Sequence, residues 1–265
     1  MPIILTRNRI EKLFEEKKER ILSVYFSAGF PKLNDTAKIM KCLQDSGADI
    51  IEVGIPFSDP VADGPTIQES NKHALDNGIS LKLIFKQLAE VRNNINIPII
   101  LMGYINPVLQ YGIEAFCKSC AEIGIDGLIL PDLPMQEYMD GYKSHFDANG
   151  LLNIFLITPQ TSESRIREID NNSRGFIYMV SSASTTGAKA AVSREQITYF
   201  KRVKSMDLKN PTLIGFGISS KESFDRACDH ASGAIIGSAF IEVLKNTKKF
   251  EEDISGFIKS VKGIK

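Results

Sequence analysis

Eight short apolar segments alternate with amphipathic stretches along the chain, and this alternation predicts an α/β protein of the (β/α)8 TIM-barrel class. The segments are apolar almost throughout, as in the Ile-Ile-Leu run at 99–101, which is typical of parallel strands buried on both faces. The length of 265 residues also accommodates one barrel of roughly 250 residues. An open, doubly wound sheet is the alternative, because only the number of strands separates the two architectures.

Each predicted strand is a short run of β-branched and aliphatic residues, and most runs are followed by turn-forming residues. In chain order the strands are predicted at residues 22–27, 50–54, 98–101, 127–130, 154–158, 176–180, 212–216 and 234–236. No low-complexity linker or change of composition divides the chain. We therefore expect residues 1–265 to form a single TIM-barrel domain.

The stretches between the strands carry the start signals of helices. Ser193 with Gln196, and Ser219 with Glu222, have the spacing of a capping box, so helices are expected to begin there. One more amphipathic helix, around residues 10–14, precedes the first strand and has no strand of its own. We expect this extra N-terminal helix to cover the bottom of the barrel.

Charge and hydropathy exclude two classes of partner. Lys plus Arg and Asp plus Glu each number 32, whereas binding a nucleic-acid backbone requires a basic surplus. No apolar run reaches the roughly 18 residues of a transmembrane helix, and no signal peptide is recognisable. The sequence thus predicts a cytoplasmic protein that binds neither nucleic acid nor membrane.

The cysteine and histidine residues give no sign of a redox or metal site. Cys117 and Cys120 form a C-x-x-C motif, but the motif falls inside a predicted helix at 113–123, where two semi-buried thiols are expected. Three scattered histidines provide no zinc-binding pattern. We therefore expect no metal.

Glu52 is the most informative residue, because it lies in the apolar second strand at the end where TIM barrels hold their active sites. Strand alternation places Glu52 on the same face as Ile50 and Gly54, and we expect that face to point into the barrel mouth. Burial should raise the pKa of such a carboxyl group toward neutrality, which suits a residue that gives and takes a proton. The alternative is a structural carboxylate paired with a Lys or Arg.

A second carboxylate follows in the loop after this strand. Asp63 lies in a proline- and glycine-rich loop that is stiff enough to present a side chain at a fixed place. Asp59 shares the loop, and one of the two is expected to be only a turn or capping residue. The sequence does not separate them.

Glycines after the last two strands predict a phosphate site. Gly215 and Gly217 end the seventh strand, and Gly237 with Ser238 links the eighth strand to its helix. Glycines let backbone N–H groups approach an anion, and a helix N-terminus adds free donors at the position where many barrels bind phosphate. Either motif alone could be a plain turn.

The run E-V-G-I-P-F-S-D-P-V-A-D-G-P-T-I-Q at 52–68 closely resembles the signature of the tryptophan synthase alpha subunit family. The resemblance extends over essentially the whole chain, including the segments at 27–29, 104–107, 131–134, 186–187, 215–218 and 237–239. It implies retro-aldol cleavage of indole-3-glycerol phosphate to indole and glyceraldehyde 3-phosphate, as part of L-tryptophan biosynthesis.

The resemblance also implies a role for each matching residue. Glu52 matches the family's acid–base carboxylate, and Asp63 matches the carboxylate that accepts the indole N–H. The residues expected around the substrate are Tyr25, Tyr178 and Phe216 in the indole slot, Thr186 orienting the aspartate, and Gly187, Gly217, Gly237 and Ser238 near the phosphate.

Loop six departs from the family pattern. Many members carry an Arg-Ser/Ala-Gly-Val-Thr-Gly run, whereas this chain has Ser182-Ala183-Ser184 before Thr185-Thr186-Gly187, so the arginine is missing and the first glycine is a serine. We expect this departure to affect lid closure and signalling to the partner more than the chemistry.

The family works with a beta subunit that carries pyridoxal phosphate, in an α2β2 heterotetramer, so this chain is expected to hold no cofactor itself. Candidate interface residues are Pro56, Phe57, Asp59, Pro60, Asn106 and Pro107, and the alternative is that they pack as an ordinary lid over the ligand. Two other functions stay open: a catalytically weak subunit that mainly activates its partner, and a stand-alone lyase or isomerase acting on another phosphorylated sugar.

Overall fold

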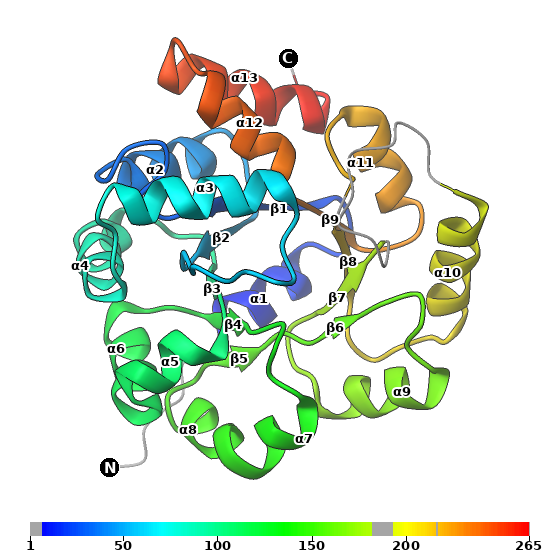
Figure 1. Cartoon of the computed structure of the whole chain (residues 1–265). Coiled ribbons are helices and arrows are strands. Elements are labelled where there is room, and N and C mark those ends of the chain that lie inside the picture. Colours follow the sequence, from blue (N-terminus) through cyan, green and yellow to red (C-terminus); the bar gives the residue numbers. More distant parts are fainter. Residues whose placement is uncertain (1–6, 182–192, 216, 265) are drawn as a thin grey trace.

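The computed structural model describes residues 7–181, 193–215 and 217–264. Within these ranges, nine parallel strands form one sheet in the order β5-β4-β3-β2-β1-β9-β8-β7-β6. The strands form a ring with helices around its outside (Figure 1). This arrangement confirms the predicted TIM barrel. None of the helices in the described part of the chain has the length and hydropathy needed to cross a bilayer.

The predicted strands agree closely with the observed ones. The observed bounds are β1 (Ile21–Ser27), β2 (Ile50–Gly54), β3 (Ile99–Met102), β4 (Gly127–Ile129), β5 (Leu152–Asn153), β6 (Leu156–Ile157), β7 (Ile177–Val180), β8 (Thr212–Gly215) and β9 (Gly233–Ile236). Only the fifth prediction, at 154–158, needs correction, because β5 and β6 take its place and begin two residues earlier.

These two short strands close the barrel. β5 pairs with β4, where Leu152 is in register with Gly127, and β6 pairs with β7, where Leu156 is in register with Tyr178. Between them, the Ile154 N–H donates to the carbonyl of Leu128 at 2.9 Å. The extended stretch 152–157 therefore forms hydrogen bonds first with β4 and then with β7. In this way the two ends of the strand order meet.

The helices on the outside follow the strands in turn. Their bounds are α2 (Thr36–Asp45), α3 (Pro65–Asp76), α4 (Leu81–Val91), α5 (Ile105–Tyr111), α6 (Ile113–Ile123), α7 (Met135–Glu137), α8 (Lys143–Ala148), α9 (Glu163–Asn172), α10 (Arg194–Ser205), α11 (Lys221–Cys228), α12 (Ser238–Asn246) and α13 (Phe250–Lys262). A 3-10 turn (Arg92–Asn94) follows α4, and a π-helical segment (Tyr138–Tyr142) joins α7 to α8.

One of the two predicted capping boxes is confirmed, and the other is wrong by one residue. Ser193 caps α10 together with Gln196. Helix α11 is capped by Ser220 rather than Ser219, because the extended backbone of Ser220 lets its hydroxyl accept the Ser223 N–H. The C-x-x-C motif lies within α6 as predicted, with both thiols completely buried rather than semi-buried.

Helix α1 (Arg9–Glu16) lies behind the centre of the ring in Figure 1 and covers the bottom of the barrel, as predicted. Its Ile10 and Phe14 join the apolar cluster inside the ring, where Phe14 packs on Phe176 with ring centroids 5.7 Å apart. The other buried residues of this inner cluster, in or next to the strands, are Ile21, Ile50, Ile100, Ile129, Leu152, Ile154, Phe176, Tyr178, Leu213 and Ile235.

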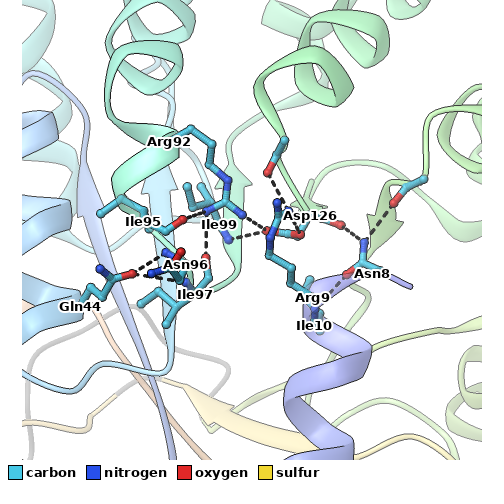
Figure 2. Close-up of polar contacts among 12 residues, drawn as sticks. Asn8, Arg9, Ile10, Gln44, Arg92, Ile95, Asn96, Ile97, Ile99 and Asp126 are labelled. Carbon is cyan, nitrogen blue, oxygen red and sulfur yellow. Dashed lines mark hydrogen bonds and ion pairs between the residues drawn. The ribbon is translucent and has the colours of Figure 1, made fainter. Parts of the chain in front are cut away.

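Asp126 fixes the start of α1 to the barrel (Figure 2). Arg9 donates to its Oδ1 at 2.9 Å, and Arg92 approaches its Oδ2 at 3.3 Å. The Ile99 N–H also donates to Oδ2, at 2.9 Å. Asn8 donates to the backbone carbonyl of Asp126 at 2.8 Å and caps α1 with its own side-chain oxygen. A buried carboxylate with several donors thus stabilises the bottom of the barrel.

Candidate active site

Glu52 lies in the middle of β2, between Tyr25 of β1 and Ile100 of β3 in register. It shares the inward face of the strand with Ile50 and is 0 % exposed, so its predicted orientation is confirmed. Ser23 donates a hydrogen bond of 2.6 Å to Glu52 Oε1, whereas Oε2 has no hydrogen-bond partner among the described residues.

The environment of Glu52 favours its protonated form. Burial raises its pKa to about 7, against the opposing effect of the Ser23 hydrogen bond. None of the ion pairs found within the described residues involves Glu52, so the alternative of a structural salt bridge receives no support there. A carboxyl group with a pKa near neutrality can serve as both proton donor and acceptor.

Asp63, in the loop between β2 and α3, is the second buried acid. It is 6 % exposed, and burial raises its pKa to about 6 although Tyr104 donates a hydrogen bond to it. The Tyr104 hydroxyl also accepts the Ala62 N–H at 2.9 Å, and Asn71 Nδ2 lies 3.5 Å from Asp63 Oδ2. Asp59, by contrast, is exposed and accepts from the neighbouring Ser58. The structure thus distinguishes two aspartates that the sequence could not.

The side chains of Tyr25 and Tyr178 each pack against a glycine at the end of a neighbouring strand, Gly54 of β2 and Gly215 of β8. A Cβ atom on Gly54 would lie 2.3 Å from the Tyr25 hydroxyl, and one on Gly215 would lie 2.2 Å from the Tyr178 hydroxyl. Both tyrosines are buried, and the charges of Glu52 and Asp63 help to raise the pKa of each. The two acids and the two tyrosines therefore belong to one site at the mouth of the barrel.

A narrow crevice with a free volume of only about 10 Å³ borders this group. Its lining residues are Tyr25, Ile55, Asp63, Asn71, Met102, Gly103, Tyr104 and Pro131. The crevice therefore reaches Asp63 and Tyr25 from the ends of β2, β3 and β4.

Of the predicted phosphate residues, Gly237 lies beside Tyr25. Gly237 is the N-cap of α12, and a Cβ atom there would lie 3.5 Å from Tyr25 Cδ1. Ser238, in the first turn of α12, is exposed, as is Gly217, which has a positive φ and open space around it. The predicted residues Phe216, Thr186 and Gly187, and the departure at 182–184, lie outside the described residues.

Four polar residues of the site were missed from the sequence: Ser23, Ser27, Asn71 and Tyr104. Ser27 donates to Asn71 Oδ1 at 2.8 Å, and Asn71 in turn faces Asp63. Strand alternation puts Ser23 and Ser27 on the same face as Tyr25, which was the available signal for both serines. No group of three or more His, Cys, Asp or Glu residues in the described ranges is arranged to hold a metal ion.

Fold and site together define a class, namely a TIM-barrel protein with buried acids at the C-terminal mouth of its strands, where enzymes of this fold hold their active sites. A family model for the tryptophan synthase alpha chain matches residues 11–264. A tryptophan synthase alpha chain from Flavobacterium johnsoniae is 59% identical over 241 residues, which cover 91% of this chain and 94% of the relative. One from Parabacteroides distasonis is 55% identical over 96% of this chain and 99% of its own length.

Solved structures agree with these sequence relatives. The tryptophan synthase alpha subunit of Legionella pneumophila superposes with a TM-score of 0.88 at 34% identity, covering 97% of this chain and 98% of the other. A chain of Mycobacterium tuberculosis tryptophan synthase gives a TM-score of 0.84 at 28% identity, covering 96% and 98%. The chain belongs to the tryptophan synthase alpha chain family.

Proposed function

We propose that this chain cleaves indole-3-glycerol phosphate to indole and glyceraldehyde 3-phosphate, with Glu52 as the acid–base residue. The observation that carries the proposal is the Glu52 carboxyl group, which is buried inside the barrel, has one oxygen without a hydrogen-bond partner among the described residues, and has a pKa of about 7. A buried acid with an unsatisfied oxygen lowers the stability of the fold, and a role in proton transfer explains why it is present.

The proposed chemistry needs two separate carboxylates. Glu52 protonates indole C3 and helps to remove the proton from the glycerol hydroxyl, so the bond between C3 and the glycerol chain breaks and an aldehyde forms. Positive charge that develops on the indole ring is stabilised by Asp63, which accepts the ring N–H. Its burial, and its contacts with Tyr104 and Asn71, support a fixed position for this carboxylate.

The remaining residues are proposed to hold the substrate. Tyr25, Tyr178 and Phe216 form the indole slot, and Thr186 orients Asp63. The phosphate is bound by the residues Gly187, Gly217, Gly237 and Ser238. The start of α12 at Ser238 supports this placement, because free N–H groups and the helix dipole favour an anion.

We propose that the chain acts as one domain in a cytoplasmic α2β2 complex whose beta subunit carries pyridoxal phosphate, while the chain itself needs no cofactor. An exposed apolar residue on the loop after β2, beside a half-buried phenylalanine, supports a partner surface. Val61 is 83% exposed, and Phe57 stacks on Tyr104 with centroids 5.3 Å apart.

Indole release from indole-3-glycerol phosphate tests the proposal, with the chain measured alone and together with a beta subunit. We expect slow release by the chain alone and faster release with the partner. Release of no indole in either condition contradicts the proposal. Stimulation of a beta subunit without any release by this chain would instead favour a subunit that only activates its partner.

A further inference from the structure

Ser23 is a buried polar residue to which the proposed chemistry assigns no role. It lies on the inward face of β1 between Ile21 and Tyr25 and is 0 % exposed. Its register partners are Ile50 on β2 and Ile235 on β9, and both belong to the apolar cluster inside the barrel. The Ser23 hydroxyl therefore lies in apolar surroundings, with the Glu52 carboxyl group as its hydrogen-bond partner.

We propose that Ser23 is a positioning residue for the reaction: its hydroxyl holds Glu52 Oε1 and leaves Oε2 as the oxygen that exchanges a proton with the substrate. This inference rests on the proposed function, because it names the reactive oxygen of the proposed acid–base residue.

The geometry of the carboxyl group supports this division between its two oxygens. The distance of 2.6 Å from Ser23 Oγ to Oε1 is typical of a hydroxyl donating to a charged acceptor. Oε2 is buried and has no hydrogen-bond partner among the described residues. When a proton binds to Oε2, Oε1 remains an acceptor for Ser23. The same hydrogen bond therefore holds the side chain in one orientation in both protonation states.

The same hydrogen bond opposes the effect of burial. Burial raises the pKa of Glu52, and the Ser23 hydrogen bond lowers it, with a balance at about 7. In the described ranges, the titratable groups that face Glu52 are Tyr25 on β1 and Tyr178 on β7, and Asp63 acts on the same two tyrosines. These tyrosines stay neutral, because burial raises the pKa of both. Without the Ser23 hydroxyl, the carboxylate would lose the donor that favours its charged form.

The first test measures the protonation of Glu52 without substrate. The carbonyl infrared band of the neutral carboxyl group, identified as the band that Glu52→Gln removes, is titrated in the native chain, Ser23→Ala and Ser23→Thr. We expect Ser23→Ala to raise the pKa of Glu52 by about one unit, since a hydrogen bond to a charged group is lost. Ser23→Thr keeps the hydroxyl and should keep the native pKa. An unchanged pKa in Ser23→Ala overturns the inference.

The matched control is Ser173→Ala. Ser173 is also buried, and its hydroxyl donates at a similar 2.6 Å, but to the carbonyl of Ile169 on the outer helix α9. We expect this variant to leave the infrared titration of Glu52 unchanged. A shift equal to that of Ser23→Ala would mean that any buried serine deletion disturbs the site, and would overturn the inference. Thermal unfolding confirms that each variant is folded before titration.

The second test is the pH profile of indole release in the presence of the beta subunit. For Ser23→Ala, the limb of the kcat profile that reports Glu52 should move to higher pH by about one unit, with KM close to native because the substrate contacts remain. A raised KM with an unchanged kcat profile overturns the inference. If the native chain releases no indole, the proposed function fails, whereas the infrared titration still shows whether Ser23 controls Glu52.

Discussion

The two ends of the barrel each contain a buried carboxylate, and the two carboxylates differ in how many hydrogen-bond donors they have. At the bottom, Asp126 accepts hydrogen bonds from Arg9, Arg92 and the Ile99 N–H, so both of its oxygens are paired. At the mouth, Glu52 has one donor, Ser23, and its second oxygen has no partner within the described part of the chain. A paired carboxylate holds structure together, whereas an underpaired one retains the capacity to bind a proton. The first end should therefore control stability and the second end activity.

The largest expected effect is on stability, from Asp126→Ala. The change leaves the buried Arg92 guanidinium without its carboxylate, which should lower the free energy of unfolding by about 3–5 kcal/mol. Urea unfolding measures this loss, and kcat of the folded fraction should remain native. Asp225→Ala is the matched control, because the ion pairs of Asp225 with Arg20 and Lys221 lie at the surface and should contribute little. Equal losses in both variants would contradict the comparison.

The next effect is on activity, from Glu52→Gln. This change keeps the shape of the side chain and an acceptor for Ser23 but removes the exchangeable proton. We expect a loss of at least ~3 kcal/mol of transition-state stabilisation, a hundredfold or more in kcat/KM. Indole release measures the loss, and thermal unfolding should show a fold at least as stable as native. Near-native turnover would show that Glu52 is not the acid–base residue.

The pH dependence of stability sharpens the comparison further. Burial raises the pKa of Glu52 from 4.5 to about 7, so between these values the folded chain holds a proton that the unfolded chain releases. The contribution of Glu52 to stability is fully present below pH 4.5 and is lost as the pH rises to about 7. The shift corresponds to a loss on the order of 3 kcal/mol.

Urea unfolding of the native chain and Glu52→Gln across this pH range tests the prediction. The stability advantage of the variant should grow as the pH rises and become constant above about pH 7. A difference that does not change with pH would contradict the assigned pKa.

The smallest expected effect comes from Gly237→Leu at the mouth. The longer side chain would cover the proposed phosphate position and should raise KM roughly tenfold, or about 1.4 kcal/mol. Stability should change little, since a Cβ atom at Gly237 makes only ordinary contacts of 3.5 Å. Gly256→Leu in α13, also with space around its Cβ position, is the control and should leave KM unchanged. Loss of folding in Gly237→Leu alone would show that the glycine is a turn former.

Much of the fold and part of the site could be predicted from the sequence. Strands buried on both faces are apolar, so the segments with Ile50 and Ile99 were recognisable, and Glu52 was conspicuous as an acid within one of them. The split into β5 and β6 was not predictable, because it depends on which neighbour each peptide group meets across the barrel.

The rest of the site depends on contacts between strands and loops. Asp63 and Asp59 differ in burial only because the loop turns one inward and the other to solvent. Ser23 belongs to no motif, and its hydrogen bond to Glu52 follows from the register of β1 against β2. The need for glycine at Gly54 becomes visible only when the Tyr25 ring is placed over it.

The way the ring is closed determines which strand pairs can open transiently. Strands β5 and β6 are two residues long, whereas β1 spans seven and lies at the centre of the strand order, diametrically across from them. Transient widening should therefore begin at the short strands, where the fewest ladder bonds must open. Glu52 lies on the opposite wall, so we expect opening at β5 and β6 to leave the hydrogen bond between Ser23 and Glu52 intact.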